Sequence, residues 1–258
     1  MKWVVGNWKM HTTAQEAKLL ARQLREELYE PELPRRVRVI VCPPFTSLCS
    51  VQEALRGSWL QWGAQNCHEE LEGAFTGEIS VRMLTALGCS AVIVGHSERR
   101  RAAGESTERI ARKLRRVLQS GLWAILCVGE TLVQRRARRI RTVLKHQLHS
   151  ALQGLEPQQW NSLLIAYEPV WAIGTGQAAE PEHIRQAHAL VAELLAQLGA
   201  PAHVPILYGG SVTAENAQRI LQLPEVDGVL VGSASLDAWQ FCTIVRVAAL
   251  CTSPVQTC

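Results

Sequence analysis

One carboxylate in the sequence stands between an apolar run and a glycine-rich loop. Residues 163–167 form the apolar run, which suits a strand buried on both faces, and Glu168 follows it directly. Pro169 fixes the backbone after this residue, whereas Gly174 and Gly176 allow it to move or to approach a ligand closely. The pattern predicts a catalytic base at a strand end, followed by a lid. Taken alone, such a carboxylate is more often an exposed surface residue.

Four other motifs also follow apolar runs of strand length. They are GNWK at 6–9, GHSERR at 95–100, YGGSV at 208–212 and GSASL at 232–236. When Glu168 takes a proton from a carbon beside a carbonyl, Lys9 and His96 could stabilise the enediolate oxygen that forms. Glycine turns after two strands favour a phosphate site, because backbone N–H groups can bind phosphate there. The motifs together predict proton transfer on a phosphorylated substrate.

Apolar runs of strand length alternate with amphipathic stretches of helix length along the chain. The runs begin near Trp3, Val37, Trp59, Ser90, Leu122, Leu163, Val204 and Asp227. The helix-length stretches cover residues 13–30, 48–55, 79–87, 106–120, 131–152, 181–198, 213–223 and 238–250. Ser106 and Thr213 are predicted as N-caps. Eight such units predict a (β/α)8 barrel, in which all loops that follow strands open on one face and bring the motifs together.

The 258 residues contain no Pro/Ser/Gly-rich linker, so one domain covering residues 1–258 is the prediction. A doubly wound open sheet is the structural alternative. It would need a G-x-G-x-x-G turn after the first strand, which this chain lacks. No apolar run reaches the length of a membrane span, and the N-terminus begins a strand at once rather than a secretory signal. We therefore expect a cytoplasmic protein.

The chain has eight cysteines and none form a C-x-x-C pair, which argues against a zinc site. We expect most of them to be reduced and buried, and the last residue, Cys258, to be exposed. The segment 68–72 is one His short of a zinc-binding H-E-x-x-H helix. No metal is predicted.

Positive charge is concentrated in residues 99–141, which hold thirteen Lys and Arg against three Glu. A nucleic-acid surface usually adds exposed aromatic residues or a known binding module, and neither is evident here. We expect a solvated helix over residues 135–141, with any polyanion binding a side effect of charge.

Together the five motifs resemble triosephosphate isomerase from Trp3 to about Val247. The resemblance implies a single-domain TIM barrel that interconverts dihydroxyacetone phosphate and D-glyceraldehyde 3-phosphate in glycolysis and gluconeogenesis. By this likeness Glu168 shuttles the proton through an enediolate and His96 acts as a neutral electrophile. Lys9 attracts the substrate dianion and stabilises the enediolate, and Asn7 holds a substrate oxygen or positions Lys9.

The resemblance also assigns further residues, and it implies neither a metal nor an organic cofactor. The residues that would bind phosphate are Gly174, Ser211, Gly232 and Ser233. The lid would consist of Pro169, Val170, Trp171, Ala172, Ile173, Gly174, Thr175, Gly176, Gln177, Ala178 and Ala179. Supporting roles would fall to Glu98, Cys127, Tyr208 and Thr76.

Residues 67–79 resemble the family's third loop, which inserts into a pocket of a twin subunit. A homodimer is therefore implied, with Thr76 reaching toward the partner's active site. From the residues alone this segment could equally be a surface turn. The partners implied are triose phosphates and a second copy of the chain, with neither nucleic acid nor a membrane.

The chain departs from the family pattern at several positions. The lid usually ends Gly-Lys-Thr-Ala, and here residues 176–179 read GQAA. Ser233 stands where a second glycine is usual, His11 where Asn is common, and residues 133–136 where the family has an acidic run. Two rival functions are another phosphosugar barrel enzyme and a non-catalytic paralogue that keeps the dimer scaffold.

Overall fold

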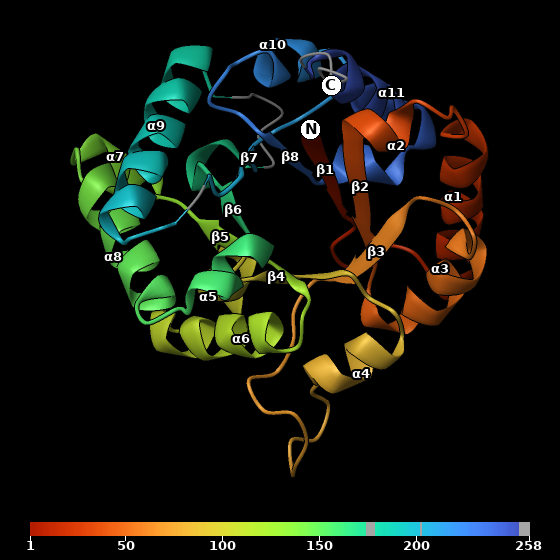
Figure 1. Ribbon diagram of the computed structural model, residues 1–258, viewed down its shortest axis with the longest axis horizontal. Coiled ribbons are helices and arrows are strands. Elements are labelled where there is room, and N and C mark those ends of the chain that lie inside the picture. The colour runs from red at the N-terminus through yellow and green to blue at the C-terminus, as the bar shows by residue number, and fades with distance from the viewer. Residues whose placement is uncertain (174–178, 202, 253–258) are drawn as a thin grey trace.

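The chain forms a closed barrel of parallel strands in the computed structural model, which describes residues 1–173, 179–201 and 203–252. Eight strands of these residues pair in the order β1 to β8, and helices surround them (Figure 1). The strands are β1 (Lys2–Asn7), β2 (Val37–Cys42), β3 (Gln61–Ala64), β4 (Ala91–Val94), β5 (Trp123–Val128), β6 (Leu163–Tyr167), β7 (Ile206–Tyr208) and β8 (Gly228–Val231). The predicted (β/α)8 barrel is confirmed, and the open-sheet alternative is wrong because β8 pairs with β1.

Helices connect successive strands around the outside of the barrel. The α-helices are α1 (Ala14–Glu27), α2 (Leu33–Arg36), α3 (Leu48–Leu55), α4 (Val81–Ala86), α5 (Ser97–Ala102), α6 (Thr107–Gln119), α7 (Leu132–Arg136), α8 (Ile140–Leu152), α9 (Pro181–Gln197), α10 (Ala217–Leu221) and α11 (Ala238–Leu250). Short 3₁₀ helices are η1 (Phe45–Ser47), η2 (Pro157–Ser162), η3 (Val170–Ala172) and η4 (Ser233–Leu236). Each strand begins within two residues of its predicted start, whereas α2 and α5 were not predicted.

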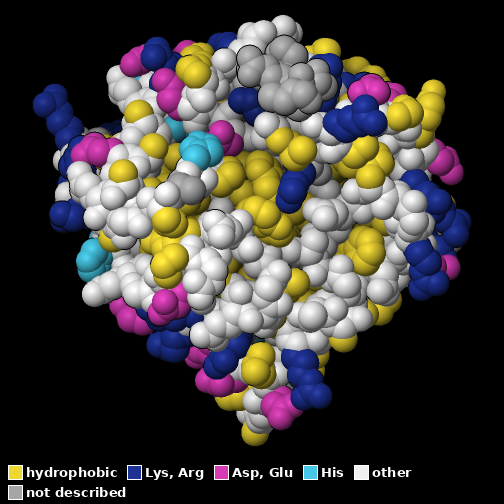
Figure 2. Space-filling model, in the orientation of Figure 1, with side chains coloured by type: hydrophobic (Ala, Val, Ile, Leu, Met, Phe, Trp, Pro, Cys, Tyr) yellow, Lys and Arg dark blue, Asp and Glu magenta, His cyan; other side chains and the backbone are white. Residues whose placement is uncertain are grey.

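Two hydrophobic clusters fill the molecule because the side chains of each strand alternate between the two faces of the sheet. Inside the barrel lie Trp3, Val5, Ile40, Cys42, Ala91, Ile93, Ile125, Cys127, Leu164, Ala166, Leu207 and Leu230. Residues of the opposite alternation, such as Val4 and Val39, face the helices and belong to the larger cluster. With both faces buried, the strands appear in the sequence as continuous apolar runs. Charged side chains are gathered mainly toward the margin of the molecule, around a hydrophobic centre (Figure 2).

The two predicted N-caps have different outcomes. Ser106 Oγ accepts a hydrogen bond from the Arg109 N–H at 3.3 Å, so its assignment as the cap of α6 is confirmed. Thr213 is not a cap, because α10 starts only at Ala217. Instead the Thr213 N–H donates to Asn216 Oδ1 at 2.9 Å and closes a turn before the helix. The predicted helical stretch 213–223 is correspondingly too long.

The predicted single helix over residues 131–152 is wrong, and so is a continuous helix over 135–141. The chain breaks between α7 and α8 at Arg138, whose φ is +56°. The Arg138 N–H donates to Arg135 O and the Arg139 N–H to Gln134 O, each at 2.9 Å. These two bonds form a Schellman motif, in which the left-handed position is usually glycine. The pattern of apolar residues does not reveal such a break, because the motif consists of backbone hydrogen bonds and one left-handed residue.

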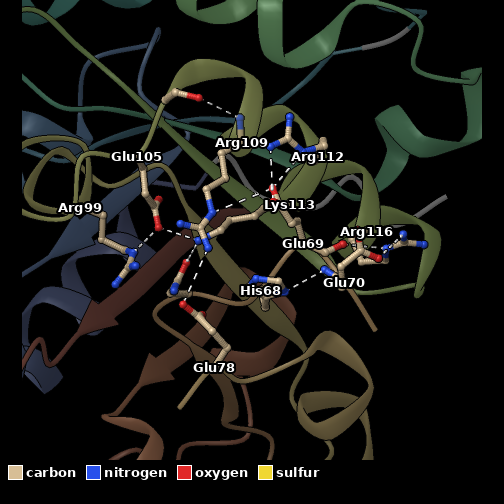
Figure 3. A network of polar contacts seen from close by, with 12 residues as sticks. His68, Glu69, Glu70, Glu78, Arg99, Glu105, Arg109, Arg112, Lys113 and Arg116 are labelled. Carbon is tan, nitrogen blue, oxygen red and sulfur yellow. Dashed lines mark hydrogen bonds and ion pairs between the residues drawn. The ribbon is translucent and has the colours of Figure 1, made fainter. Parts of the chain in front are cut away.

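Arginines of α6 pair with acidic residues in the long segment between β3 and α4, which projects from the barrel (Figures 1 and 3). Arg112 Nε lies 2.9 Å from Glu69 Oε2, and Arg116 Nη2 lies 3.7 Å from Glu70 Oε2. Arg109 Nη2 lies 3.7 Å from Glu78 Oε1. Each partly exposed pair contributes about 0.2–1 kcal/mol. The pairs brace the segment and reduce the charge that this face of α6 offers to a polyanion.

All seven cysteines among the described residues are free thiols. Five are buried, Cys251 is half-buried, and only Cys49 of the seven is exposed. The expectation of mostly buried cysteines is confirmed for this part of the chain, and the prediction for Cys258 lies outside the described residues. No helix of the described chain has the length and hydrophobicity needed to cross a membrane.

Replacing Arg138 with glycine should raise the free energy of unfolding by about 0.5–1 kcal/mol. Glycine adopts the left-handed conformation without the strain that a side chain causes, which stabilises the folded protein. The greater conformational freedom of glycine in the unfolded chain offsets part of this gain. Urea unfolding measures it, and Arg139→Gly is the matched control, since it removes the same charge at a residue with φ of −98°. An Arg138→Gly variant no more stable than Arg139→Gly would contradict the strain.

Candidate active site

A cleft of about 480 Å³ opens where the loops after the strands meet. It is lined by Asn7, Trp8, Lys9, His11, His96, Glu168, Ile173, Gly209, Gly210, Ser211, Val212, Thr213, Leu230, Gly232, Ser233 and Leu236. The described residues that were predicted to act on or bind the substrate therefore come together in one place. In the space-filling view, hydrophobic side chains line a recess near the centre of the molecule (Figure 2).

Glu168 continues the line of β6 into the cleft, and glycines on both sides make room for it. Its N–H donates to Val128 O at 2.7 Å, which extends the pairing of β5 with β6 by one residue. A Cβ on Gly129 would lie 1.7 Å from the Glu168 carbonyl oxygen. A Cβ on Gly209 would lie 3.0 Å from Glu168 Cγ. Side chains at either position would displace the carboxylate.

The carboxylate of Glu168 is buried and held by two donors from the turn that joins β4 to α5. Glu168 Oε1 lies 2.9 Å from His96 Nε2, and Oε2 accepts a hydrogen bond from the Ser97 N–H at 2.8 Å. The residue is only 2% exposed. A buried carboxylate needs such donors, since losing hydration without replacement costs several kcal/mol.

His96 is the N-cap residue of α5, and this position settles how its ring is used. Nδ1 accepts a hydrogen bond from the Glu98 N–H at 3.3 Å, so in the neutral ring the proton is on Nε2, which faces Glu168. Burial favours the neutral form, but the charges of Glu168 and Glu98 outweigh burial, and the pKa of His96 lies above its ordinary value. Glu168 contributes more to this rise than Glu98 does.

Lys9 occupies the left-handed region, with φ of +53°, which costs a non-glycine residue about 1–2 kcal/mol. Its N–H donates to Asn7 Oδ1 at 3.1 Å, and its carbonyl accepts from Gln65 Nε2 at 2.8 Å. Lys9 Nζ lies 2.6 Å from Glu98 Oε1. Burial would raise the pKa of Glu98, but Lys9 and His96 outweigh it and hold this pKa below its usual range.

The loops after β7 and β8 supply the predicted phosphate residues Ser211, Gly232 and Ser233 to the same cleft. A Cβ on Gly232 would lie 3.5 Å from Lys9 Cε, so this loop is next to the ammonium. Gly232 has φ of −88°, and Ser233 is not among the residues with positive φ. The backbone of this turn therefore accepts serine without left-handed strain.

The first part of the predicted lid is anchored on Glu130. Trp171 Nε1 donates to Glu130 Oε1 at 2.8 Å, and the Arg135 guanidinium lies 4.5 Å from the Trp171 ring centroid. Tyr167 OH donates to the same carboxylate, 3.1 Å from either oxygen. Burial, followed by the Glu130 charge, raises the pKa of this phenol. Glu130 thus connects β6 with the start of the lid.

The end of the predicted lid is fixed by Tyr208. The Ala179 N–H donates to Tyr208 OH at 3.0 Å, and a Cβ on Gly210 would lie 2.2 Å from that hydroxyl. Residues 174–178, which include the phosphate candidate Gly174 and the lid residues Thr175, Gly176, Gln177 and Ala178, lie outside the described residues.

Two other supporting residues lie apart from the cleft surface. Cys127 is buried inside the barrel, where burial and then the nearby Glu168 charge hold its pKa well above the usual range. Thr76 lies exposed on the projecting segment, and it is not among the residues that line the cleft of its own chain.

Among the residues with close contacts at the site, several were not assigned from the sequence, including Gln65, Ser97, Arg100, Gly129 and Glu130. Ser97 acts through its backbone N–H, and Gly129 acts by lacking a side chain, so their residue types gave no indication. Glu130 could have been found, because it follows the apolar run of β5 as the other motifs follow theirs. No group of three or more His, Cys, Asp or Glu among the described residues is placed to hold a metal ion.

The family model described as Triosephosphate isomerase matches residues 2–248. The chain belongs to the triosephosphate isomerase family. It is 46% identical over 254 residues to a triosephosphate isomerase of Symbiobacterium thermophilum, covering 95% of this chain and 96% of that relative. A triosephosphate isomerase of Chloroflexus aurantiacus is 46% identical over 246 residues, which are 94% of this chain and 97% of the relative. One of Syntrophotalea carbinolica is 43% identical over 251 residues, 96% and 98% of the two chains.

Membership of the triosephosphate isomerase family confirms the resemblance and the predicted isomerase activity. The matched range agrees with the expected extent from Trp3 to about Val247. It also argues against another kind of phosphosugar barrel enzyme, since the relatives match over nearly their whole length.

Ser233→Gly should change phosphate affinity and melting temperature only slightly, with any change in affinity a small loss. The reason is that Ser233 is unstrained and its hydroxyl can add a hydrogen bond to phosphate. Inhibition by inorganic phosphate and thermal unfolding measure the two effects. A markedly more stable variant that binds phosphate more tightly would show that the serine is strained after all.

Proposed function

We propose that Glu168, His96 and Lys9 interconvert dihydroxyacetone phosphate and D-glyceraldehyde 3-phosphate in this chain, in glycolysis and gluconeogenesis. The observation that carries the assignment is their convergence on one cleft with the glycine turns after β7 and β8. A non-catalytic paralogue would not need to keep a buried carboxylate, an imidazole and a strained lysine together. The roles below follow from the contacts of each group.

Glu168 is the base that moves the proton between adjacent carbons of the substrate. Both of its oxygens are engaged, one with His96 Nε2 and the other with the Ser97 N–H. To reach a substrate carbon in the cleft, the carboxylate exchanges these donors for the substrate. Gly209 lies beside Glu168 Cγ, where a larger residue would restrict this movement. A base freed from its donors is stronger, which favours proton abstraction.

His96 is the neutral electrophile that donates from Nε2 to the substrate oxygens. Of the two carboxylates that raise its pKa, Glu168 contributes more than Glu98, and the movement of the Glu168 carboxylate onto the substrate removes that larger contribution. Burial and the Glu98 N–H bound to Nδ1 then favour the neutral ring. This reconciles the raised pKa of His96 in contact with Glu168 with a neutral donor during the reaction, a role established for this kind of enzyme.

Lys9 supplies the positive charge that stabilises the enediolate, with Asn7 holding it in place. Ser211, Gly232 and Ser233 bind the phosphate, together with Gly174. The lid, residues 169–179, covers the substrate and excludes water. Support for a lid comes from its two anchors, Trp171 on Glu130 and Ala179 on Tyr208. Neither a metal nor an organic cofactor takes part in the proposed chemistry.

The chain is further proposed to act as one domain, to form a homodimer through residues 67–79 and to work in the cytoplasm. Support for the dimer comes from the segment that projects from the barrel. Its Phe75 is 43% exposed, although the centroid of the Phe75 ring lies 4.2 Å from that of the His68 ring. Thr76, the next residue in this segment, would brace Lys9 or Asn7 of the partner. Support for the cytoplasm is the glycolytic role of the family and the free thiols of the described residues.

Glu168→Asp should lower kcat by about a hundredfold, because the shorter side chain withdraws the base by about 1 Å. A coupled assay started with glyceraldehyde 3-phosphate measures the rate. Thermal unfolding and inhibition by inorganic phosphate serve as controls, and neither should change much. A rate close to that of the wild type would rule out Glu168 as the base.

Excision of residues 74–77 should give a soluble monomer with sharply reduced activity, because the segment would no longer reach the second copy. Analytical ultracentrifugation gives the oligomeric state, and the coupled assay gives the activity. Glu72→Gln, a change in the same segment outside the excised residues, is the control and should leave the dimer intact. An active dimer after the excision would refute this assignment of the segment.

A further inference from the structure

Arg100 binds the backbone at the ends of two neighbouring strands. Its Nε donates to Gly95 O at 2.7 Å, just past β4, and its Nη2 donates to Cys127 O at 3.0 Å, on β5. The Arg100 N–H donates to His96 O at 3.0 Å as well. One side chain therefore ties the turn that carries His96 to the strand that precedes Gly129. A guanidinium is suited to this because its donors form a rigid planar fork.

The turn held by Arg100 contains a residue in the left-handed conformation. Gly95 has φ of +72°, and a Cβ there would lie 3.0 Å from Arg100 Nη2. The guanidinium thus packs against the bare side of Gly95 while it binds that residue's carbonyl. The position of this turn decides where His96 Nε2 and the Ser97 N–H are, and these are the two donors that hold Glu168.

Arg100 also differs from its neighbours in how its charge is balanced. Arg99 forms an ion pair with Glu105 at 2.6 Å, and Arg101 is exposed to solvent. Arg100 is half-buried and forms no ion pair with any carboxylate of the described residues. Burial lowers the pKa of Arg100, while Coulombic interactions with Cys127, were it ionised, and with the carboxylates of Glu168 and Glu105 act in the opposite sense. Since Glu105 is bound by Arg99 and Lys113, Glu168 is the carboxylate whose charge this cation can offset.

We propose that Arg100 is a positioning residue for the isomerisation, which fixes the turn that carries the donors of Glu168 and whose positive charge acts on that carboxylate. The inference rests on the proposed role of Glu168 as the base. Arg100 does not line the cleft, so it acts through other groups rather than on the substrate. A purely structural arginine would also stabilise the barrel, but it would not affect the ionisation of Glu168.

Two substitutions separate the geometric part of this role from the electrostatic part. Arg100→Lys keeps the charge but cannot bind both carbonyls in a fork, whereas Arg100→Gln also removes the charge. Arg101→Lys is the matched control on the same helix. Arg100→Lys should lower kcat by about 10–100-fold, because displacements of the order of 1 Å at reacting groups have effects of this size. Its KM should stay within about threefold of wild type, since the phosphate loops follow β7 and β8.

The pH profile of kcat/KM provides a measurement that a merely structural role would not change. Removing a cation that acts on Glu168 disfavours the ionised carboxylate, so the acidic limb should shift upward in Arg100→Gln and stay in place in Arg100→Lys. The other titratable groups near the carboxylate are His96 and Cys127, and Glu105 lies near Arg100. These groups and the substrate phosphate are the same in both variants, so the comparison isolates the charge at position 100.

The proposal is supported if Arg100→Lys loses kcat while its melting temperature and its inhibition by inorganic phosphate stay close to those of Arg101→Lys. It is overturned if Arg100→Lys retains wild-type kcat, or if the acidic limb of Arg100→Gln is unchanged. Should Arg100→Gln fail to fold, the kcat of Arg100→Lys alone decides. A wild-type protein without isomerase activity would instead refute the proposed function, so the two failures are distinguishable.

Discussion

The rest of the site depends on the contact of the buried Glu168 carboxylate with two donors, His96 Nε2 and the Ser97 N–H. A carboxylate that is 2% exposed remains ionised only where donors or cations replace its lost hydration. Both donors come from the turn after β4, whereas the carboxylate follows β6. They meet because β5 pairs with both strands, which sets β4, β5 and β6 side by side with their ends at one rim. The barrel thus brings together groups that are 71 residues apart.

Much of the fold could be predicted because burial on both faces gives a parallel strand an unbroken apolar sequence. The run at 163–167 is β6 to the residue. What the sequence hid were features set by the backbone. Arg138 ends α7 in a left-handed conformation that normally belongs to glycine, so hydrophobic periodicity continued across a real break. Thr213 resembled an N-cap, but its backbone N–H binds Asn216 and delays α10 to Ala217.

The candidate site was predictable to the extent that it uses side chains at strand ends. Asn7 is the last residue of β1, and Lys9, His96 and Glu168 lie one or two residues past their strands; all four line one cleft. The residues that sequence reasoning missed work in other ways. Gly129 leaves room because it has no side chain, and Ser97 contributes its backbone N–H. Glu130 accepts a hydrogen bond from Trp171, 41 positions away. Predicting such roles requires knowing which strand ends are neighbours, and the motifs do not contain that information.

The charged groups of the cleft are paired with one another, and this determines what a substrate can gain. Lys9 is bound to Glu98 and His96 to Glu168, so neither pair is free to act on a substrate without rearrangement. In the proposed mechanism the phosphate provides the driving force, because Gly232 lies next to the Lys9 side chain and a dianion bound there attracts the ammonium. Binding energy from the non-reacting phosphate is thereby used to reorganise the reacting groups. A triose without phosphate would leave Lys9 on Glu98, and its turnover would suffer more than its binding.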